Sequence, residues 1–328
     1  MSWQKKIAIL TPLLKGGFVG SWQIVPVCNL QLKLKKMKQS HRSRTAEGAA
    51  AMRASHVLYA DPIIFADPFA ASLVSYPWQR ALKNPILHRI IFGVFMRPLL
   101  PIQGQVLARA RFTEERLMTA IAQGVKQIVV IGAGLDTFCL RHPELAEQVQ
   151  VYEIDHSASQ QFKKRRLIKN GLGIPANLEF ISANLERENL AHALRQSNYN
   201  PDQPSFFYWL GVTVYLTREA IFQTLESVAE IAGNGSELVF DYAGAVNEIP
   251  KEEQANIRLL RFYTERFGEP IIDNQFKPLE FTQQVSGLGF KLMENMSPDE
   301  QNQCYFLNRA DRLRPVSGSY FAHFRLEK

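Results

Sequence analysis

The feature that most constrains this chain is a short apolar run that ends in a glycine-rich turn. Gln127-Ile-Val-Val-Ile131 leads directly into Gly132-Ala-Gly134-Leu-Asp136-Thr137. Glycines at the end of a strand let the backbone turn sharply and bring its N–H groups close to a ligand, because no Cβ is in the way. The pattern therefore predicts a strand, a turn that contacts a ligand, and a following helix.

An acidic pair follows at the spacing that an adenosine ribose requires. A second short run, Val149-Gln-Val-Tyr152, ends in Glu153 and Asp155. Asp155 lies 21 positions after Gly134. In folds of this kind an acidic side chain about 20 residues after the turn accepts hydrogen bonds from the ribose hydroxyls. We therefore predict a site for an adenosyl ligand.

The third position of the glycine pattern distinguishes between two adenosyl ligands. A dinucleotide site has a third glycine, where this chain has Thr137 preceded by Asp136. An acidic residue in the turn would repel a diphosphate, but it can accept hydrogen bonds from an ammonium group or from water. This suits the amino-acid end of S-adenosylmethionine, so we favour that cofactor over a nicotinamide dinucleotide.

Composition and charge exclude several classes of protein. The three cysteines, Cys28, Cys139 and Cys304, are too few and too scattered for a disulfide framework or a zinc site, so we predict no metal and a cytoplasmic location. Residues 1–44 carry nine of the Lys and Arg residues and no Asp or Glu, which leaves the rest nearly neutral. We therefore expect no nucleic-acid partner for the main body. The apolar run at 7–14 is too short to span a bilayer, so we expect no stable membrane insertion.

The order of predicted elements indicates an α/β fold with a doubly wound, mostly parallel sheet. Strands are predicted at 126–131, 149–154, 177–182, 204–210, 236–241, 289–294 and 303–308, the last two as an antiparallel pair. Helices are predicted at 45–58, 105–122, 136–147, 157–170, 188–197, 217–231 and 250–267.

Four segments follow from this order. Residues 1–42 form a basic leader, which is either disordered or an extension upstream of a start at Met37. Residues 43–104 form an N-terminal helical lid, 105–310 a cofactor-binding domain, and 311–328 a C-terminal tail. The sequence gives no indication of the oligomeric state.

Seven motifs in one order resemble the leucine carboxyl methyltransferase-like family of class I S-adenosylmethionine-dependent methyltransferases, which have a Rossmann-like fold. The motifs are Ser43-Arg-Thr-Ala-Glu47, Arg53-Ala54, Asp67-Pro-Phe-Ala70, Ala108-Arg-Ala-Arg-Phe112, Gly132-Ala-Gly-Leu-Asp-Thr137, Tyr152-Glu-Ile-Asp155 and Trp209-Leu-Gly-Val-Thr-Val-Tyr-Leu-Thr217.

The resemblance implies roles for particular residues. Arg109, or its neighbour Arg111, would pair with the carboxylate of the methionine moiety, a task that suits a planar guanidinium. Arg44 would assist from the N-terminal segment. Gly132 and Gly134 would contact the cofactor through the backbone, and Asp155 would hold the ribose, with Glu153 supporting the end of the strand.

The chain departs from the family pattern at two positions. Asn184-Leu185 stands where the family usually has Asp-Leu, which binds the adenine amino group and packs on the ring; the Asn carbonyl oxygen can accept the same bond. Leu210 stands where relatives with protein-carboxylate substrates often have Glu. This favours a small-molecule acceptor over a protein tail.

We therefore predict an enzyme that transfers a methyl group to a carboxyl or hydroxyl oxygen of a small molecule. A carboxylate acceptor needs no base, whereas a hydroxyl does. The weak candidates for a base are Tyr215 and His56, each of which has packing as its other interpretation. The alternatives are a protein carboxyl methyltransferase and a catalytically silent adenosyl-binding protein. The acceptor itself cannot be read from the sequence.

Overall fold

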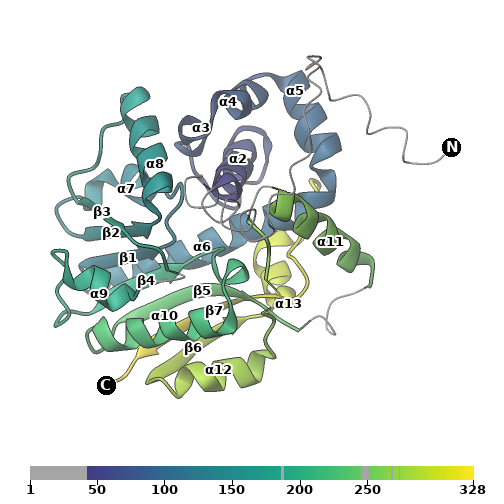
Figure 1. Ribbon diagram of the computed structural model, residues 1–328. Helices are drawn as coiled ribbons and strands as arrows, with labels where there is room; N and C mark the ends of the chain where they lie inside the picture. The colour runs from purple at the N-terminus through teal and green to yellow at the C-terminus, as the bar shows by residue number, and fades with distance from the viewer. Residues whose placement is uncertain (1–42, 186–187, 246–250, 267–268, 273) are drawn as a thin grey trace, which may run out of the picture. The chain divides into compact units, whose positions relative to one another are not determined.

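A computed structural model describes residues 43–185, 188–245, 251–266, 269–272 and 274–328. Within these ranges the seven strands form one sheet in the order β3-β2-β1-β4-β5-β7-β6 (Figure 1). Strands β1 to β5 pair in parallel, and β7 pairs antiparallel with both β5 and β6. The strands are β1 (Gln127–Ile131), β2 (Gln150–Asp155), β3 (Leu178–Ser182), β4 (Ser205–Trp209), β5 (Glu237–Ala243), β6 (Phe290–Met296) and β7 (Ser319–Leu326).

The helices connect the strands and cover both faces of the sheet, which confirms the predicted doubly wound α/β architecture. The N-terminal helices are α2 (Arg44–Tyr59), α3 (Ala70–Leu73), α4 (Tyr76–Lys83), α5 (Pro85–Ile90), η2 (Ile91–Phe95), η3 (Arg97–Leu99) and α6 (Leu100–Ala122). The others are α7 (Phe138–Arg141), η4 (Pro143–Leu145), α8 (Ser157–Lys169), α9 (Leu190–Arg195), η5 (Thr213–Tyr215), α10 (Arg218–Ile231), α11 (Lys251–Arg266), α12 (Pro278–Ser286), α13 (Pro298–Gln301) and η7 (Asn302–Phe306).

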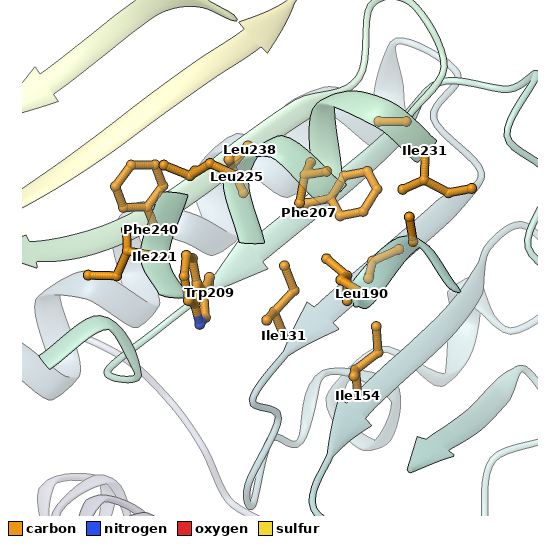
Figure 2. Close-up of a cluster of buried hydrophobic side chains, with 14 of the residues drawn as sticks. Ile131, Ile154, Leu190, Phe207, Trp209, Ile221, Leu225, Ile231, Leu238 and Phe240 are labelled. Carbon is orange, nitrogen blue, oxygen red and sulfur yellow. The ribbon is translucent and has the colours of Figure 1, made fainter. Parts of the chain in front are cut away.

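Two apolar layers fix the sheet between its helices. On one face α9, α10 and α12 pack on the alternate residues of the central strands, among them the fully buried Phe207, Trp209 and Phe240 (Figure 2). On the other face α6 contributes Leu107 and Phe112 to a second cluster. Central parallel strands are buried on both faces, which explains why β1 and β4 have every residue buried.

The last part of the chain differs from the prediction. Residues 302–306, which overlap most of the predicted strand 303–308, form the π-helix η7, which continues from α13. Ser297 begins α13 with a capping box to Glu300, a helix signal that the prediction missed.

The predicted tail at 311–328 instead contains β7, which inserts between β5 and β6. Five of the eight residues of β7 are buried, including Phe321 and Phe324, because the strand lies inside the sheet. The strand predicted at 289–294 is present as β6 and is antiparallel to its neighbour, as expected. That neighbour is β7 and not the segment 303–308.

The N-terminal helices belong to the same compact unit as the sheet, because the described residues all fall within it. Helix α6 begins at Leu100 and therefore crosses the predicted boundary between residues 104 and 105. The leader predicted at 1–42 lies outside the described residues. Within the described ranges no single helix has both the length and the apolar composition to cross a membrane; Pro85–Phe95 and Arg97–Ala122 reach that level only as a pair, bent by 66°.

Candidate functional site

The strand order reverses between β1 and β4, and several of the predicted site residues lie at or just after the carboxyl ends of strands on either side of that point. Ligands of open α/β sheets bind in the crevice at such a reversal. The glycine turn follows β1, Asp155 ends β2, and Gly211 comes two residues after β4. The topology therefore brings together segments that are about 80 residues apart in sequence.

The glycine turn and Asp155 are joined directly. Gly132 and Gly134 have φ angles of 67° and 53°, in the left-handed region that favours glycine. The backbone N–H of Gly134 donates to Asp155 Oδ2 at 2.6 Å, and the N–H of His156 donates to Oδ1 at 2.6 Å. Burial raises the pKa of Asp155, and these two bonds oppose that rise. The carboxylate keeps further lone pairs with which it can accept ribose hydroxyls.

Close contacts around the turn explain why two of its positions are glycines. A Cβ on Gly132 would lie 2.4 Å from Val212 Cγ2, in the segment after β4. A Cβ on Gly134 would lie 3.0 Å from Ala46 Cβ, in the first turn of α2. The turn is therefore enclosed by the β4 segment on one side and by α2 on the other.

Arg109 is held by a network that the sequence analysis did not find. Its Nη1 donates to Asp241 Oδ2 at 2.9 Å, and Gln105 Nε2 donates to the same oxygen at 3.1 Å. The N–H of Gly211 donates to Asp241 Oδ1 at 2.6 Å. A Cβ on Gly211 would lie 2.3 Å from the Arg109 guanidinium, so the arginine rests on the glycine backbone. Asp241 therefore fixes both the arginine of α6 and the turn after β4.

This arrangement leaves Arg109 able to bind an anion. The guanidinium has five N–H donors, and the structure commits one of them to Asp241. The side chain is 16% exposed, so a carboxylate that reached it would be bound largely out of water. The sequence signal for Asp241 is a single acidic residue within the apolar run Leu238-Val-Phe-Asp-Tyr242.

A second missed residue, Glu269, closes the start of α2. It accepts hydrogen bonds from the backbone N–H groups of Arg44 and Thr45 at 2.8 and 3.1 Å, and from the hydroxyls of Ser43 and Thr45. A carboxylate at a helix N-terminus is stabilised by the unpaired N–H groups and by the helix dipole. Glu269 lies about 225 positions from α2, so local patterns could not reveal the contact.

Tyr215 lies beside this helix start. Burial raises the pKa of Tyr215, and a hydrogen bond with Thr45 opposes the rise. Arg109 and Asp241 are close enough to influence the same pKa. The structure thus places Tyr215 near Arg109 and Asp241. Its raised pKa means that the hydroxyl is a neutral phenol at physiological pH.

His56 has a structural role in the fold. Its Nε2 accepts a hydrogen bond from the backbone N–H of Ile64 at 2.8 Å, and the residue is 1% exposed. Burial, with Arg309 adding to the effect, lowers its pKa to about 4. An imidazole whose basic nitrogen is already occupied is unable to accept a proton from a substrate, so the structure does not support His56 as the base.

Arg111 points away from the arginine that the network holds. It pairs with Glu115 one turn later on α6, and its side chain is 51% exposed. Two positions along a helix correspond to about 200°, so Arg109 and Arg111 lie on opposite faces. Of the two candidates, only Arg109 is brought to the site.

Two further predicted residues have local roles in the structure. Asp136 Oδ1 accepts from the backbone N–H of Phe138 at 2.8 Å, and the buried Tyr208 hydroxyl hydrogen-bonds to the same side chain. Asn184 accepts from the N–H of Glu188 at 2.8 Å through its backbone carbonyl, while Leu185 is partly buried against the central cluster. Both Asn184 and Leu185 follow β3, on the same side of the reversal as Asp155.

Glu153 forms the buried support that the sequence analysis expected. Both of its oxygens lie 2.6 Å from Lys163 Nζ on α8, and both side chains are at most 3% exposed. Burial raises the pKa of Glu153, and the Lys163 ammonium opposes that rise. The pair links α8 to β2 two residues before Asp155 in the same strand.

The residues of the site fit an adenosyl ligand with a charged amino-acid end. They offer a carboxylate with remaining lone pairs, a turn whose glycines carry no side chain, and a guanidinium held in place. Within the described ranges, no group of three or more His, Cys, Asp or Glu side chains is arranged to hold a metal ion.

Comparison with known proteins identifies the family. The family model for leucine carboxyl methyltransferase matches residues 46–229, which include α2, the glycine turn, Asp155 and Tyr215. The chain belongs to the leucine carboxyl methyltransferase family. The resemblance seen in the motifs is thereby confirmed, and with it the enzyme class, an S-adenosylmethionine-dependent methyltransferase.

One relative extends the likeness beyond the matched residues. A protein of Bacillus subtilis (strain 168), named "Putative S-adenosyl-L-methionine-dependent methyltransferase YktD", is 30% identical over 304 residues, which cover 88% of this chain and 99% of that protein. Among solved structures, a DUF574 family protein from Streptomyces avermitilis has a TM-score of 0.57 at 12% identity and covers 88% of this chain and 99% of its own. The second likeness shows the fold alone, and it agrees with the observed sheet.

Proposed function

We propose that this methyltransferase esterifies a carboxylate of a small-molecule acceptor. The proposal depends on one observation: neither of the two candidate bases, Tyr215 and His56, is set up to accept a proton. Tyr215 has a raised pKa, and the basic nitrogen of His56 is occupied by Ile64. A carboxylate acceptor reacts through an oxygen that is already deprotonated, so it needs neither of them.

The other acidic groups near Arg109 are also occupied. Asp241 accepts three hydrogen bonds and Glu269 accepts four. Most or all of their lone pairs are committed to these donors, which makes both carboxylates poor bases for a hydroxyl. A carboxylate acceptor is therefore favoured over a hydroxyl acceptor, which stays the second candidate.

The cofactor would be held by the residues that the fold gathers. Asp155 would accept bonds from the ribose hydroxyls, and Gly132 and Gly134 would contact the ligand through the backbone. Arg109 would pair with the methionine carboxylate, and Asn184 would accept from the adenine amino group with Leu185 against the ring. When bound, the sulfonium supplies the methyl group together with its leaving group. The protein's task is then to align the acceptor oxygen and exclude water.

A small-molecule acceptor is supported by Leu210, which is partly buried against the second apolar cluster at the end of β4. It replaces an acidic residue that relatives with protein-carboxylate substrates often have. A protein carboxyl methyltransferase and a silent adenosyl-binding protein are the other outcomes that a test must separate. We also propose a cytoplasmic location, which is supported by the free thiols of Cys139 and Cys304.

The test uses radiolabelled S-adenosylmethionine, the purified protein and paired acceptors that carry either a carboxyl or a hydroxyl group on the same scaffold. Methyl esters release the label as methanol in alkali, whereas methyl ethers keep it. We expect alkali-labile label in the small-molecule fraction, with a rate nearly independent of pH above the acceptor pKa. The matched control is Asp155→Ala, in which the label should be lost.

Other results would overturn the proposal. Alkali-stable label with a rate that rises with pH would indicate a hydroxyl acceptor and a base. Label in a protein fraction would indicate a protein substrate. Binding of S-adenosylmethionine without transfer to any acceptor in a broad panel would favour the silent protein.

A further inference from the structure

A group of apolar side chains is exposed on the helices that precede α6. Tyr76, Ile86, Val94 and Phe95 are 64–72% exposed, and Ile90 is 43% exposed. Single exposed apolar residues are ordinary, but several on consecutive helical segments indicate a contact surface. These five residues lie on α4, α5 and η2.

Three of the five residues form one stripe. Ile86, Ile90 and Val94 are spaced four apart along α5 and η2, so they lie above one another on one side of the helix. Phe95 follows Val94 directly and is exposed beside this stripe. The regular spacing produces a continuous apolar ridge.

The opposite side of the same helices is packed, so the exposed ridge is held in a fixed orientation. Phe92 and Leu82 are buried in the cluster shared with α2 and α3. The His88 ring stacks between Tyr59 and Phe92, with centroid distances of 3.6 and 4.8 Å, and its Nε2 lies 2.8 Å from Ser55 Oγ on α2. Helices α4 and α5 thus lie beside α2 (Figure 1), and the ridge side chains are the exposed ones.

The charged residues of the segment that carries the ridge are all positive. Residues 76–97 contain Arg80, Lys83, Arg89 and Arg97 and no Asp or Glu. All four side chains are exposed, and the structure gives none of them an ion pair with a described residue. Arg80 and Lys83, together with Tyr76, line a surface hollow of about 310 Å³. We call these four residues and the five apolar ones the basic apolar face.

We propose that the basic apolar face docks onto a membrane surface that contains anionic lipids. An apolar ridge flanked by arginine and lysine is the composition of helices that lie in the interface plane. The ridge would enter the boundary between headgroups and acyl chains, and the four cations would bind the phosphates, with the hollow at Arg80 and Lys83 receiving one headgroup.

The charge of the face favours lipid over a second copy of this chain. Two copies that met through this face would bring four cations against four cations, and like charges across an interface disfavour association. An anionic membrane supplies both the negative charge and the apolar phase. The proposal does not depend on the acceptor, so its failure would leave the proposed function standing.

The test measures sedimentation of the full-length protein with vesicles of phosphatidylcholine alone and with vesicles that contain about a quarter phosphatidylglycerol. We expect binding to the anionic vesicles, weakened by salt, and little binding to the neutral ones. Lys83→Gln combined with Arg89→Gln should weaken binding about thirty-fold, because each basic residue near an anionic surface contributes about a factor of five. Ile86→Ser combined with Phe95→Ser should weaken binding at least tenfold, because exposed apolar area no longer enters the membrane.

Matched controls change the same residue types elsewhere. Leu279→Ser removes an apolar side chain that is 71% exposed on α12. Lys126→Gln combined with Arg195→Gln removes two exposed positive charges from other parts of the surface. Both controls should keep at least half of the wild-type binding.

Three results would overturn the proposal. Wild-type binding by both face variants would assign membrane binding to another part of the chain, since the substitutions leave residues 1–42 intact. Absence of binding to anionic vesicles would exclude the lipid surface. A dimer detected by sedimentation velocity and abolished by Ile86→Ser with Phe95→Ser would identify a second copy as the occupant instead.

Discussion

Asp241 offers the sharpest test of how the site is built. The substitution Asp241→Asn keeps the shape of the side chain but removes its charge. The aspartate accepts from the Gly211 N–H, from Gln105 and from the Arg109 guanidinium, and it is 1% exposed. The amide oxygen of asparagine can keep either the bond from Gly211 or the two bonds from Gln105 and Arg109, and in each case its NH₂ group faces the remaining donors.

The magnitude follows from the bond that is lost. A hydrogen bond to a charged partner contributes about 1.5–3 kcal/mol, and Arg109 is only 16% exposed, so water replaces little of it. We expect the free energy of unfolding to fall by about 2 kcal/mol. If Arg109 binds the methionine carboxylate, loss of its orientation should also raise the Kd for S-adenosylmethionine about tenfold, equivalent to about 1.4 kcal/mol.

Glu237→Gln is the matched control on the same strand. Glu237 begins β5, where it pairs with His323 at 2.8 Å and Arg325 at 2.6 Å, at the end of the sheet opposite to the site. Its substitution should lower stability by about 1–2 kcal/mol and leave the Kd unchanged. Urea unfolding and calorimetric titration measure the two quantities. An Asp241→Asn protein that loses stability but binds the cofactor with the wild-type Kd would refute the role given to the network.

Three further predictions concern other groups. Asp155→Ala should weaken S-adenosylmethionine binding by more than tenfold in calorimetry with the far-UV circular dichroism unchanged, because ribose hydroxyls lose a charged acceptor; an unchanged Kd would exclude the ribose assignment. Lys163→Met should lower the free energy of unfolding by about 3 kcal/mol, because it leaves the buried Glu153 unpaired. Adding Glu153→Gln to this variant should recover most of the lost stability. A double variant no more stable than Lys163→Met alone would count against the pair. The pKa of His56 is about 4 in the folded protein, against about 6.5 for an ordinary histidine, so the unfolded state binds more protons between these values and the free energy of unfolding should fall by about 3 kcal/mol as the pH drops through that window. Urea unfolding of His56→Gln should show a flatter pH dependence, and an identical slope would disprove the assignment.

The central sheet was predictable because its signals are local. Five parallel strands lie within two residues of their predicted bounds at the start and at the end, since buried runs such as Gln127–Ile131 contain no competing pattern. Strand β7 was missed because His323 and Arg325 interrupt its apolar pattern, and both pair with Glu237 on the neighbouring strand. A contact between residues 86 positions apart left no trace in the local sequence.

The site shows the same division between local and distant information. The spacing predicted that the glycine turn and Asp155 belong to one ligand site, and the structure joins them by a hydrogen bond from the Gly134 N–H. The choice between Arg109 and Arg111 was left open by sequence, because both fit the same motif. Only the position of α6 against Asp241 decides which arginine reaches the site. Glu269 and Asp241 come from distant elements, so tertiary packing alone reveals them.

The membership of this chain in a methyltransferase family makes the cofactor the central claim. Calorimetric titration of the purified protein with S-adenosylmethionine, S-adenosylhomocysteine and NAD tests it most directly. We predict that the two adenosyl-sulfur ligands bind with one site per chain and that NAD gives no heat of binding. Binding of NAD, or absence of binding by both sulfur ligands, would contradict the account of the site.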